Sequence, residues 1–131
     1  MKLSYTEPGF IAELAWRGRP VLLTVEPFAA TEEVAAHAYA TEVWDWLASE
    51  YDGIQDYIPL IVREKNTHWL EIGEAEWTAA QMVTEIVGIE AVYARQDEGI
   101  MVYHDVGDAF GDKALVLMFS PHYEFCGIQL L

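Results

Sequence analysis

The closing third of the chain, residues 88–131, alternates hydrophobic and polar positions with a period close to two. Runs rich in Val, Ile, Tyr and Phe are separated by turns that contain Gly and Asp, which is the pattern of antiparallel strands. The sequence therefore predicts a C-terminal β-meander with the strands IEAVYAR, IMVYHD, ALVLMF and FCGIQLL.

The N-terminal third predicts a β-hairpin. Residues 10–16 and 21–28 flank the segment RGRP, in which Gly18 supplies a positive φ and Pro20 closes a four-residue connection. Arg17 and Arg19 in this turn need no functional role, because charged turn residues keep a protein soluble. Alternation places apolar side chains on one face of the second strand: Val21, Leu23 and Val25.

The residues between these β-regions predict helices. Thr31 is a good N-cap residue, and the apolar residues after it recur at steps of three and four until Gly53, a natural helix stop. Residues 74–87 predict another helix with one apolar stripe. Residues 54–72 fit either a short helix that opens at Pro59 or a strand, because the run is both led by proline and rich in β-branched residues. We favour the helix.

Together these elements predict an α+β fold. Helices with one apolar stripe need a sheet to cover, so we expect a single layer of two or three helices on the hairpin and the meander. The length of 131 residues fits a single domain, residues 1–131. No apolar run is long enough to cross a membrane, and the first residues lack the pattern of a secretory signal. We therefore expect a cytoplasmic protein.

The charge of the chain is strongly negative. Twenty-two Asp and Glu residues against seven Lys and Arg residues give a net charge of −15. Such a field repels nucleic acids and anionic membranes and attracts basic proteins, so we expect direct binding to neither nucleic acid nor membrane. Charge alone leaves open a nucleic-acid mimic, in which carboxylates replace phosphates in the groove of a DNA-binding protein.

Several acidic residues lie where helix stability does not favour them. Glu50 and Asp52 come at the C-terminal end of the first predicted helix, where a carboxylate opposes the helix dipole. Neighbouring acids extend this patch, and aromatic residues beside it have the size of interface anchors. The predicted partner-binding residues are Trp44, Asp45, Glu50, Tyr51, Asp52, Asp56 and Tyr57.

A second polar cluster follows one of the C-terminal strands. Its residues are His104, Asp105, Asp108 and Asp112. Carboxylates and an imidazole suit a divalent metal ion, so a small metal-dependent hydrolase that uses the 104–112 loop is an alternative function. Asp and Gly are also the ordinary residues of a turn, and the calcium-loop pattern is absent. We predict no metal site here and no cofactor.

Other catalytic signatures are missing from the chain. Cys126 with His122 could form a thiol nucleophile, but the cysteine lies in an apolar run, where it packs as a small hydrophobic residue. No nucleophile elbow, phosphate-binding glycine loop or zinc-protease motif occurs. The sequence therefore predicts a protein that is not an enzyme.

The order of several short motifs resembles that of known proteins. The motifs are W-x-G in the hairpin, a Trp in mid-chain, a D-x-G turn and an aromatic-Gly step: Trp16, Gly18, Trp69, Asp97, Gly99, Phe110 and Gly111. This order is similar to small bacterial families of unknown function, several of which occur as immunity proteins beside secreted toxins. Those families tend to carry a His after the aromatic-Gly step, where this chain has Asp112, so no site residue is carried over.

The resemblance implies a cytoplasmic, non-enzymatic α+β protein that holds another protein. An acidic inhibitor gains association rate and specificity when its target is basic. The sequence thus predicts an acidic protein-binding module of the immunity type, with a basic protein as its partner.

Overall fold

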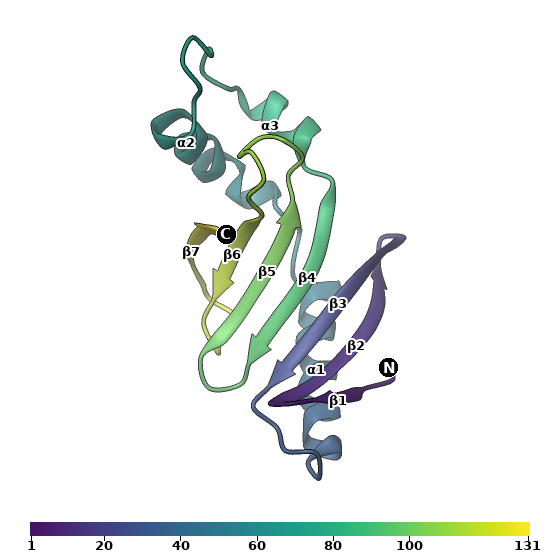
Figure 1. Ribbon diagram of the computed structural model, residues 1–131. Helices are drawn as coiled ribbons and strands as arrows, with labels where there is room; N and C mark the ends of the chain where they lie inside the picture. Colours follow the sequence, from purple (N-terminus) through teal and green to yellow (C-terminus); the bar gives the residue numbers. More distant parts are fainter.

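Parallel pairing of β3 (Arg19–Glu26) with β4 (Gly88–Arg95) joins the two β-rich ends of the chain into one sheet. The computed structural model describes all 131 residues. The strands follow the order β1 to β7 across the sheet, and every other neighbouring pair is antiparallel (Figure 1). The remaining strands are β1 (Ser4–Thr6), β2 (Gly9–Trp16), β5 (Gly99–Asp105), β6 (Leu115–Phe119) and β7 (Phe125–Leu130). The predicted α+β class, hairpin and meander are confirmed.

The connection between β3 and β4 contains all the helices. They are α1 (Glu33–Ser49), the short 3₁₀ helix η1 (Gln55–Tyr57), α2 (Ile58–His68) and α3 (Ala79–Glu85). α1 lies across one face of the sheet, whereas α2 and α3 lie beyond one end of it, near the loop between β5 and β6 (Figure 1). None of these helices combines the length and the apolar character that a membrane crossing requires.

The hydrophobic core lies between α1 and the sheet. Alternate residues of the strands point toward α1 and meet its apolar stripe in one contiguous cluster of 26 buried residues. The buried residues of α1 are Ala36, Tyr39, Ala40, Val43 and Leu47, all of which belong to the predicted stripe. The helix begins at Glu33 with Glu32, rather than Thr31, at its N-cap position.

The hairpin of β2 and β3 is tighter than predicted. Strand pairing continues to Trp16 and Arg19, so the turn contains only Arg17 and Gly18, with φ of 50° and 82°. Positive φ at both central residues is the geometry that two-residue hairpins prefer, because its twist matches that of the strands. The predicted four-residue connection is therefore wrong, and Arg19 and Pro20 belong to β3.

The helix predicted over residues 74–87 is also shorter. The side chain of Asn66 on α2 accepts from the backbone N–H of Trp77 at 2.7 Å and donates to its carbonyl oxygen at 3.0 Å. Because the N–H and C=O groups of Trp77 are hydrogen-bonded to Asn66, they are not available for helical hydrogen bonds. α3 therefore begins only after Thr78. Thr78 and Gln81 then form a capping box, which satisfies the first N–H groups of the helix.

Residues 54–72, for which the sequence allowed a helix or a strand, contain η1 and α2. The helix that we favoured is confirmed, and Pro59 lies in its first turn, where a missing N–H has no cost. The three-residue strand β1 was not predicted, and it pairs with the start of β2 at the edge of the sheet.

The tight turn from β4 to β5 requires glycine at position 99. Gly99 has a φ of +128°, and a Cβ atom there would lie 2.2 Å from the carbonyl oxygen of Phe119 on β6. We expect Gly99→Ala to lower the free energy of unfolding by at least about 2 kcal/mol, because the backbone must move in addition to adopting a strained φ.

Gly111→Ala is the matched control, since Gly111 has a φ of +67° but no atom within 4 Å of an added Cβ. It should cost only the positive-φ strain, about 1 kcal/mol. Urea unfolding of the two variants measures the difference. Equal losses of unfolding free energy in Gly99→Ala and Gly111→Ala would show that the close approach of Phe119 on β6 to position 99 adds no cost.

Candidate functional site

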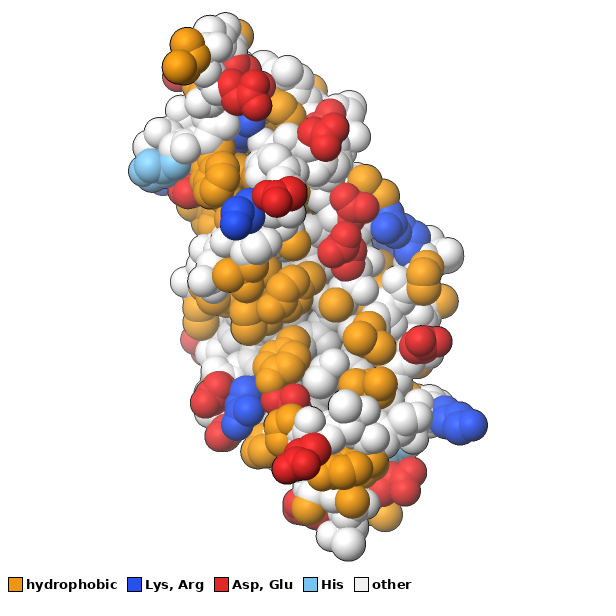
Figure 2. Space-filling model, in the orientation of Figure 1, with side chains coloured by type: hydrophobic (Ala, Val, Ile, Leu, Met, Phe, Trp, Pro, Cys, Tyr) orange, Lys and Arg blue, Asp and Glu red, His pale blue; other side chains and the backbone are white.

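One face of the sheet carries no helix and is mostly apolar. We call it the open face, and its residues are Ile11, Leu22, Thr24, Ala91, Tyr93, Met101, Tyr103, Val116 and Met118, of which Val116 is fully buried by its neighbours. None of them belongs to the buried core cluster beneath α1. Figure 2 looks onto this side, and hydrophobic side chains gather across its middle with acidic side chains around them.

The strand register builds the open face as two neighbouring rows. One row runs from β2 to β6 through Ile11, Thr24, Tyr93, Met101 and Met118, which are successive cross-strand partners. The other row contains the remaining open-face residues in the same way. An antiparallel sheet with one solvated face ordinarily has polar residues there. Apolar residues that reach solvent together on such a face mark an interaction surface; here Leu22 is 40% exposed, and the others except the buried Val116 are half-buried.

Acidic side chains border the open face. Glu13 continues the second row beyond Leu22 at the β2 end. Glu26 accepts a hydrogen bond from the Tyr93 hydroxyl and lies 3.3 Å from the Arg95 guanidinium. This hydrogen bond to the carboxylate is the main cause that raises the pKa of Tyr93. Only five of the 22 Asp and Glu side chains pair with Lys or Arg, so most of the negative charge is not neutralised.

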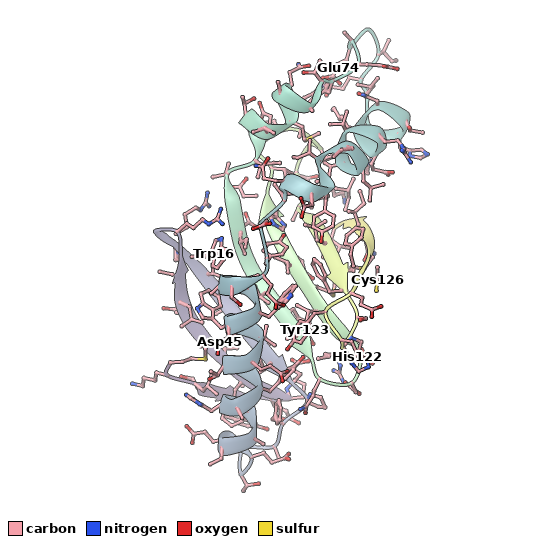
Figure 3. The ribbon with its side chains drawn as sticks, turned by 180° about the vertical axis from the view of Figure 1, so that it is seen from behind. Trp16, Asp45, Glu74, His122, Tyr123 and Cys126 are labelled. Atoms are coloured by element: carbon pink, nitrogen blue, oxygen red, sulfur yellow. The ribbon has the colours of Figure 1, made fainter.

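The acidic residues of the predicted partner-binding patch are exposed. Asp45, Glu50, Asp52 and Asp56 face solvent around the C-terminal end of α1 and the start of η1. Asp45 lies on the side of the sheet that carries α1, opposite the open face (Figure 3). These carboxylates are free to contribute to the long-range field of the protein.

The aromatic residues of that patch pack against the sheet to different degrees. Tyr51 is 5% exposed. Tyr57 stacks on Phe125 of β7 with ring centroids 4.3 Å apart, and Trp44 packs edge-on against Trp16 at 6.0 Å. Trp44 and Tyr57 keep part of their surface exposed, so the role of these rings as partner anchors stays a prediction.

The residues of the 104–112 cluster do not converge on one point. Strand alternation sends the side chain of His104 into the core and that of Asp105 to the other face of the sheet. Asp105 accepts from the backbone N–H of Gly107 at 3.0 Å and lies 3.7 Å from Arg19. All four residues of the cluster line one open hollow at this edge of the sheet. No three His, Cys, Asp or Glu side chains are placed to share a metal ion.

His104 instead forms a buried pair with Tyr51. The Tyr51 hydroxyl donates to Nε2 of His104 at 2.8 Å, and Nδ1–H of His104 donates to the carbonyl oxygen of Val102 at 3.1 Å. Both ring nitrogens are therefore occupied, and burial lowers the pKa of His104 to about 4. Burial also raises the pKa of Tyr51. The pair is a neutral polar contact that ties the end of α1 to β5.

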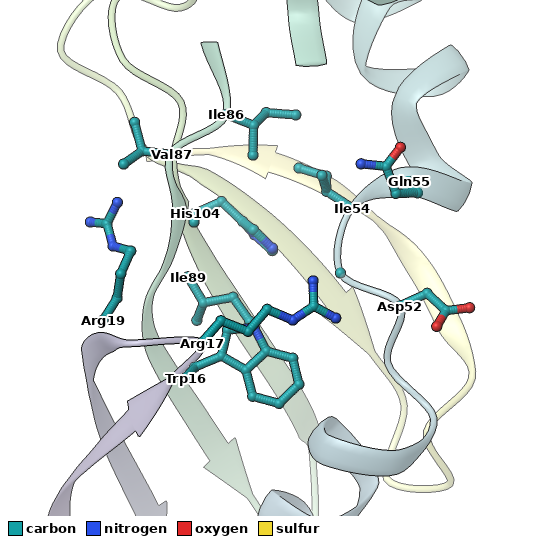
Figure 4. A pocket seen from close by; sticks show the side chains of 12 residues that line it. Trp16, Arg17, Arg19, Asp52, Ile54, Gln55, Ile86, Val87, Ile89 and His104 are labelled. Atoms are coloured by element: carbon teal, nitrogen blue, oxygen red, sulfur yellow. The ribbon is translucent and has the colours of Figure 1, made fainter. Parts of the chain in front are cut away.

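A pocket of about 220 Å³ opens where β3 and β4 separate. Their pairing begins only at Leu22 and Ala91, so the first residues of both strands leave a gap between them. We call it the seam pocket; Figure 4 shows side chains from four separate segments around it. Its lining includes Trp16, Arg17, Arg19, Ile54, Ile86 and His104. Sequence reasoning missed this site, since no signal links the hairpin turn to residues 52–55 and 86–89.

Comparison of the chain with protein-family models, with curated proteins and with solved structures gives no match. The resemblance to families of the immunity type therefore stays a prediction.

Protonation of His104 should destabilise the fold below neutral pH. Its pKa is about 4 in the folded protein against an ordinary 6.5, so the unfolded chain takes up this proton first as the pH falls. The stability that the neutral imidazole of His104 contributes is fully present above pH 6.5 and is lost as the pH falls toward 4. The free energy of unfolding should fall by up to about 1.4 kcal/mol per pH unit within that window.

Chemical unfolding at about pH 7 and about pH 5 measures this loss. His104→Gln removes the titrating group and should show a smaller decrease than the native protein. The exposed His37 provides a control, because His37→Gln should keep the native pH dependence. An unchanged pH dependence in His104→Gln would show that other groups cause it.

Proposed function

We propose that this protein is a non-enzymatic protein-binding module that inhibits a basic partner protein by covering it with the open face of its sheet. The observation that carries the proposal is the apolar character of a sheet face that no helix covers. The resemblance to immunity-type proteins and the net charge of −15 support the same function. A cytoplasmic location is part of this proposal.

A basic protein is the occupant that fits the open face best. The face spans five strands and is broad, so it suits another protein surface rather than a small molecule. A second copy of the chain is disfavoured, because two partners that each carry −15 repel one another. Nucleic acid is repelled for the same reason.

The apolar centre and the acidic border have different tasks in this proposal. Desolvated aromatic and Met side chains near the middle of an interface carry most of the binding free energy, and Tyr93, Met101 and Tyr103 hold that position here. Exposed carboxylates act over a longer range and accelerate the encounter with a basic protein. The acids around the end of α1, such as Asp45 and Glu50, belong to this second group.

The two alternative functions have less support. A metal-dependent hydrolase would use the 104–112 loop, but both nitrogens of His104 are hydrogen-bonded and the loop carboxylates do not converge. A nucleic-acid mimic would present carboxylates along the surface that its target reads. The broad surface here is instead apolar, with acids at its border.

Met101→Lys tests the open face directly. Met101 lies in the middle of the first row, and a lysine there places a positive charge against a basic partner without entering the core. Affinity capture from the native host at about 50 mM salt supplies the partner, which is then purified. We expect Met101→Lys to weaken its binding at least about 30-fold, which is about 2 kcal/mol.

Ala48→Lys is the matched control, since Ala48 is exposed on α1 and the charge change is the same. It should change the affinity by less than about threefold. Native binding should also weaken as salt rises from about 50 mM to about 500 mM, because screening shortens the reach of the charges. Co-expression with the partner gives the functional readout: the native protein relieves the partner's effect on growth, and Met101→Lys does not. Equal binding by the two lysine variants would refute the open face as the interface.

A further inference from the structure

The seam pocket concentrates positive charge in an otherwise acidic protein. Arg17 and Arg19 are two of only seven Lys and Arg residues, and both line this pocket. Arg17 has no carboxylate within 4 Å, and its guanidinium lies 5.1 Å from the centroid of the Trp16 ring. Arg19 lies 3.7 Å from Asp105, and both side chains are about a third exposed, so this ion pair is weak. Arg17 extends across the pocket, whereas Arg19 lies on the other side of β4, beside Val87 (Figure 4). The guanidinium of Arg17 therefore has donors available for an anion inside the pocket.

The rest of the lining mixes apolar side chains with the polar side chains of Gln55, His104 and Asp52. Ile54 and Ile86 lie near each other on one side of it, and the Trp16 ring closes the opposite side (Figure 4). His104 lies at the back as a neutral imidazole whose two nitrogens are already bonded. Asp52 stands at the border and directs its carboxylate away from the pocket (Figure 4). A ligand here meets the positive charge of Arg17 on one side, apolar contact with Trp16, Ile54 and Ile86, and the amide of Gln55.

We propose that the seam pocket binds a monocarboxylate that carries one small apolar group. A planar carboxylate matches the paired N–H donors of a guanidinium. Phosphates and other polyanions are disfavoured by the net charge of −15 and by Asp52 at the border. The volume of about 220 Å³ lies below the roughly 300–1,000 Å³ of pockets for drug-sized ligands, so the apolar group is one ring or one branched chain.

Two sources supply this chemistry. One is a free acid such as benzoate or 3-methylbutanoate, and the other is the C-terminal carboxylate of a peptide that ends in Leu or Phe. The site does not depend on the proposed function, because its arginines and apolar walls do not belong to the open face. Its occupant is an anion, whereas the proposed partner of the open face is basic.

Titration calorimetry and the indole N–H signal of Trp16 in NMR spectra test the proposal. The probes are benzoate, 3-methylbutanoate and an acetylated dipeptide that ends in Leu, each beside its uncharged amide. We expect the acids to bind and to shift the Trp16 signal, and the amides to bind at least about 10-fold more weakly. Tighter binding of the free acids identifies a small-molecule site, and tighter binding of the peptide identifies a C-terminus site.

Arg17→Asn is the decisive variant, because Asn tolerates the positive φ of this turn and keeps the hairpin folded. It should weaken carboxylate binding about 10- to 100-fold. Arg63→Gln removes the same charge from an exposed position on α2, away from the pocket, and should change binding less than about twofold. Equal binding of acids and amides, an unaffected Arg17→Asn variant, or no binding of any acid at about 10 mM would each overturn the proposal.

Discussion

The parallel pairing of β3 with β4 is the constraint on which the rest of the fold depends. Antiparallel neighbours can be joined by a tight turn, but parallel neighbours need a crossover connection. Residues 27–87 form that connection, and they contain every helix of the protein. Because there is only one crossover, helices cover one face of the sheet and extend beyond its end. The open face is therefore a consequence of the strand order rather than of a missing element.

Topology explains why this face is bare, but it does not explain why the face is apolar. The core beneath α1 forms without Met101, Tyr103 or Met118, so folding does not require apolar residues at these positions. An exposed apolar surface favours association between copies. The net charge of −15 opposes that association by repulsion, while it still permits the approach of a basic protein. A basic protein partner would thus explain both the apolar open face and the acidic composition.

The elements of this fold follow from local patterns, whereas its sites follow from long-range pairing. Period-two alternation predicts β4 to β7, and steps of three and four predict α1, because each pattern reflects which neighbouring residues share a face. The packing of Tyr51 on β6 and of Tyr57 on β7 depends on where the chain after α1 meets these strands, which no local pattern encodes. The bonds from Asn66 to Trp77 that shorten α3 are equally non-local. The open face becomes visible only when the register of five strands is known.

The seam pocket depends on the same parallel pair as the open face. β4 carries an irregularity between Ile89 and Ala91, next to the point where its pairing with β3 begins. Bulges of this kind re-aim side chains and end a ladder, and here the ladder ends at the pocket. A ligand held between Arg17 and Ile54 would contact the hairpin and the connection after α1 at once. Binding would then stabilise the junction between the two halves of the sheet by mass action, because these segments come together only in the folded state.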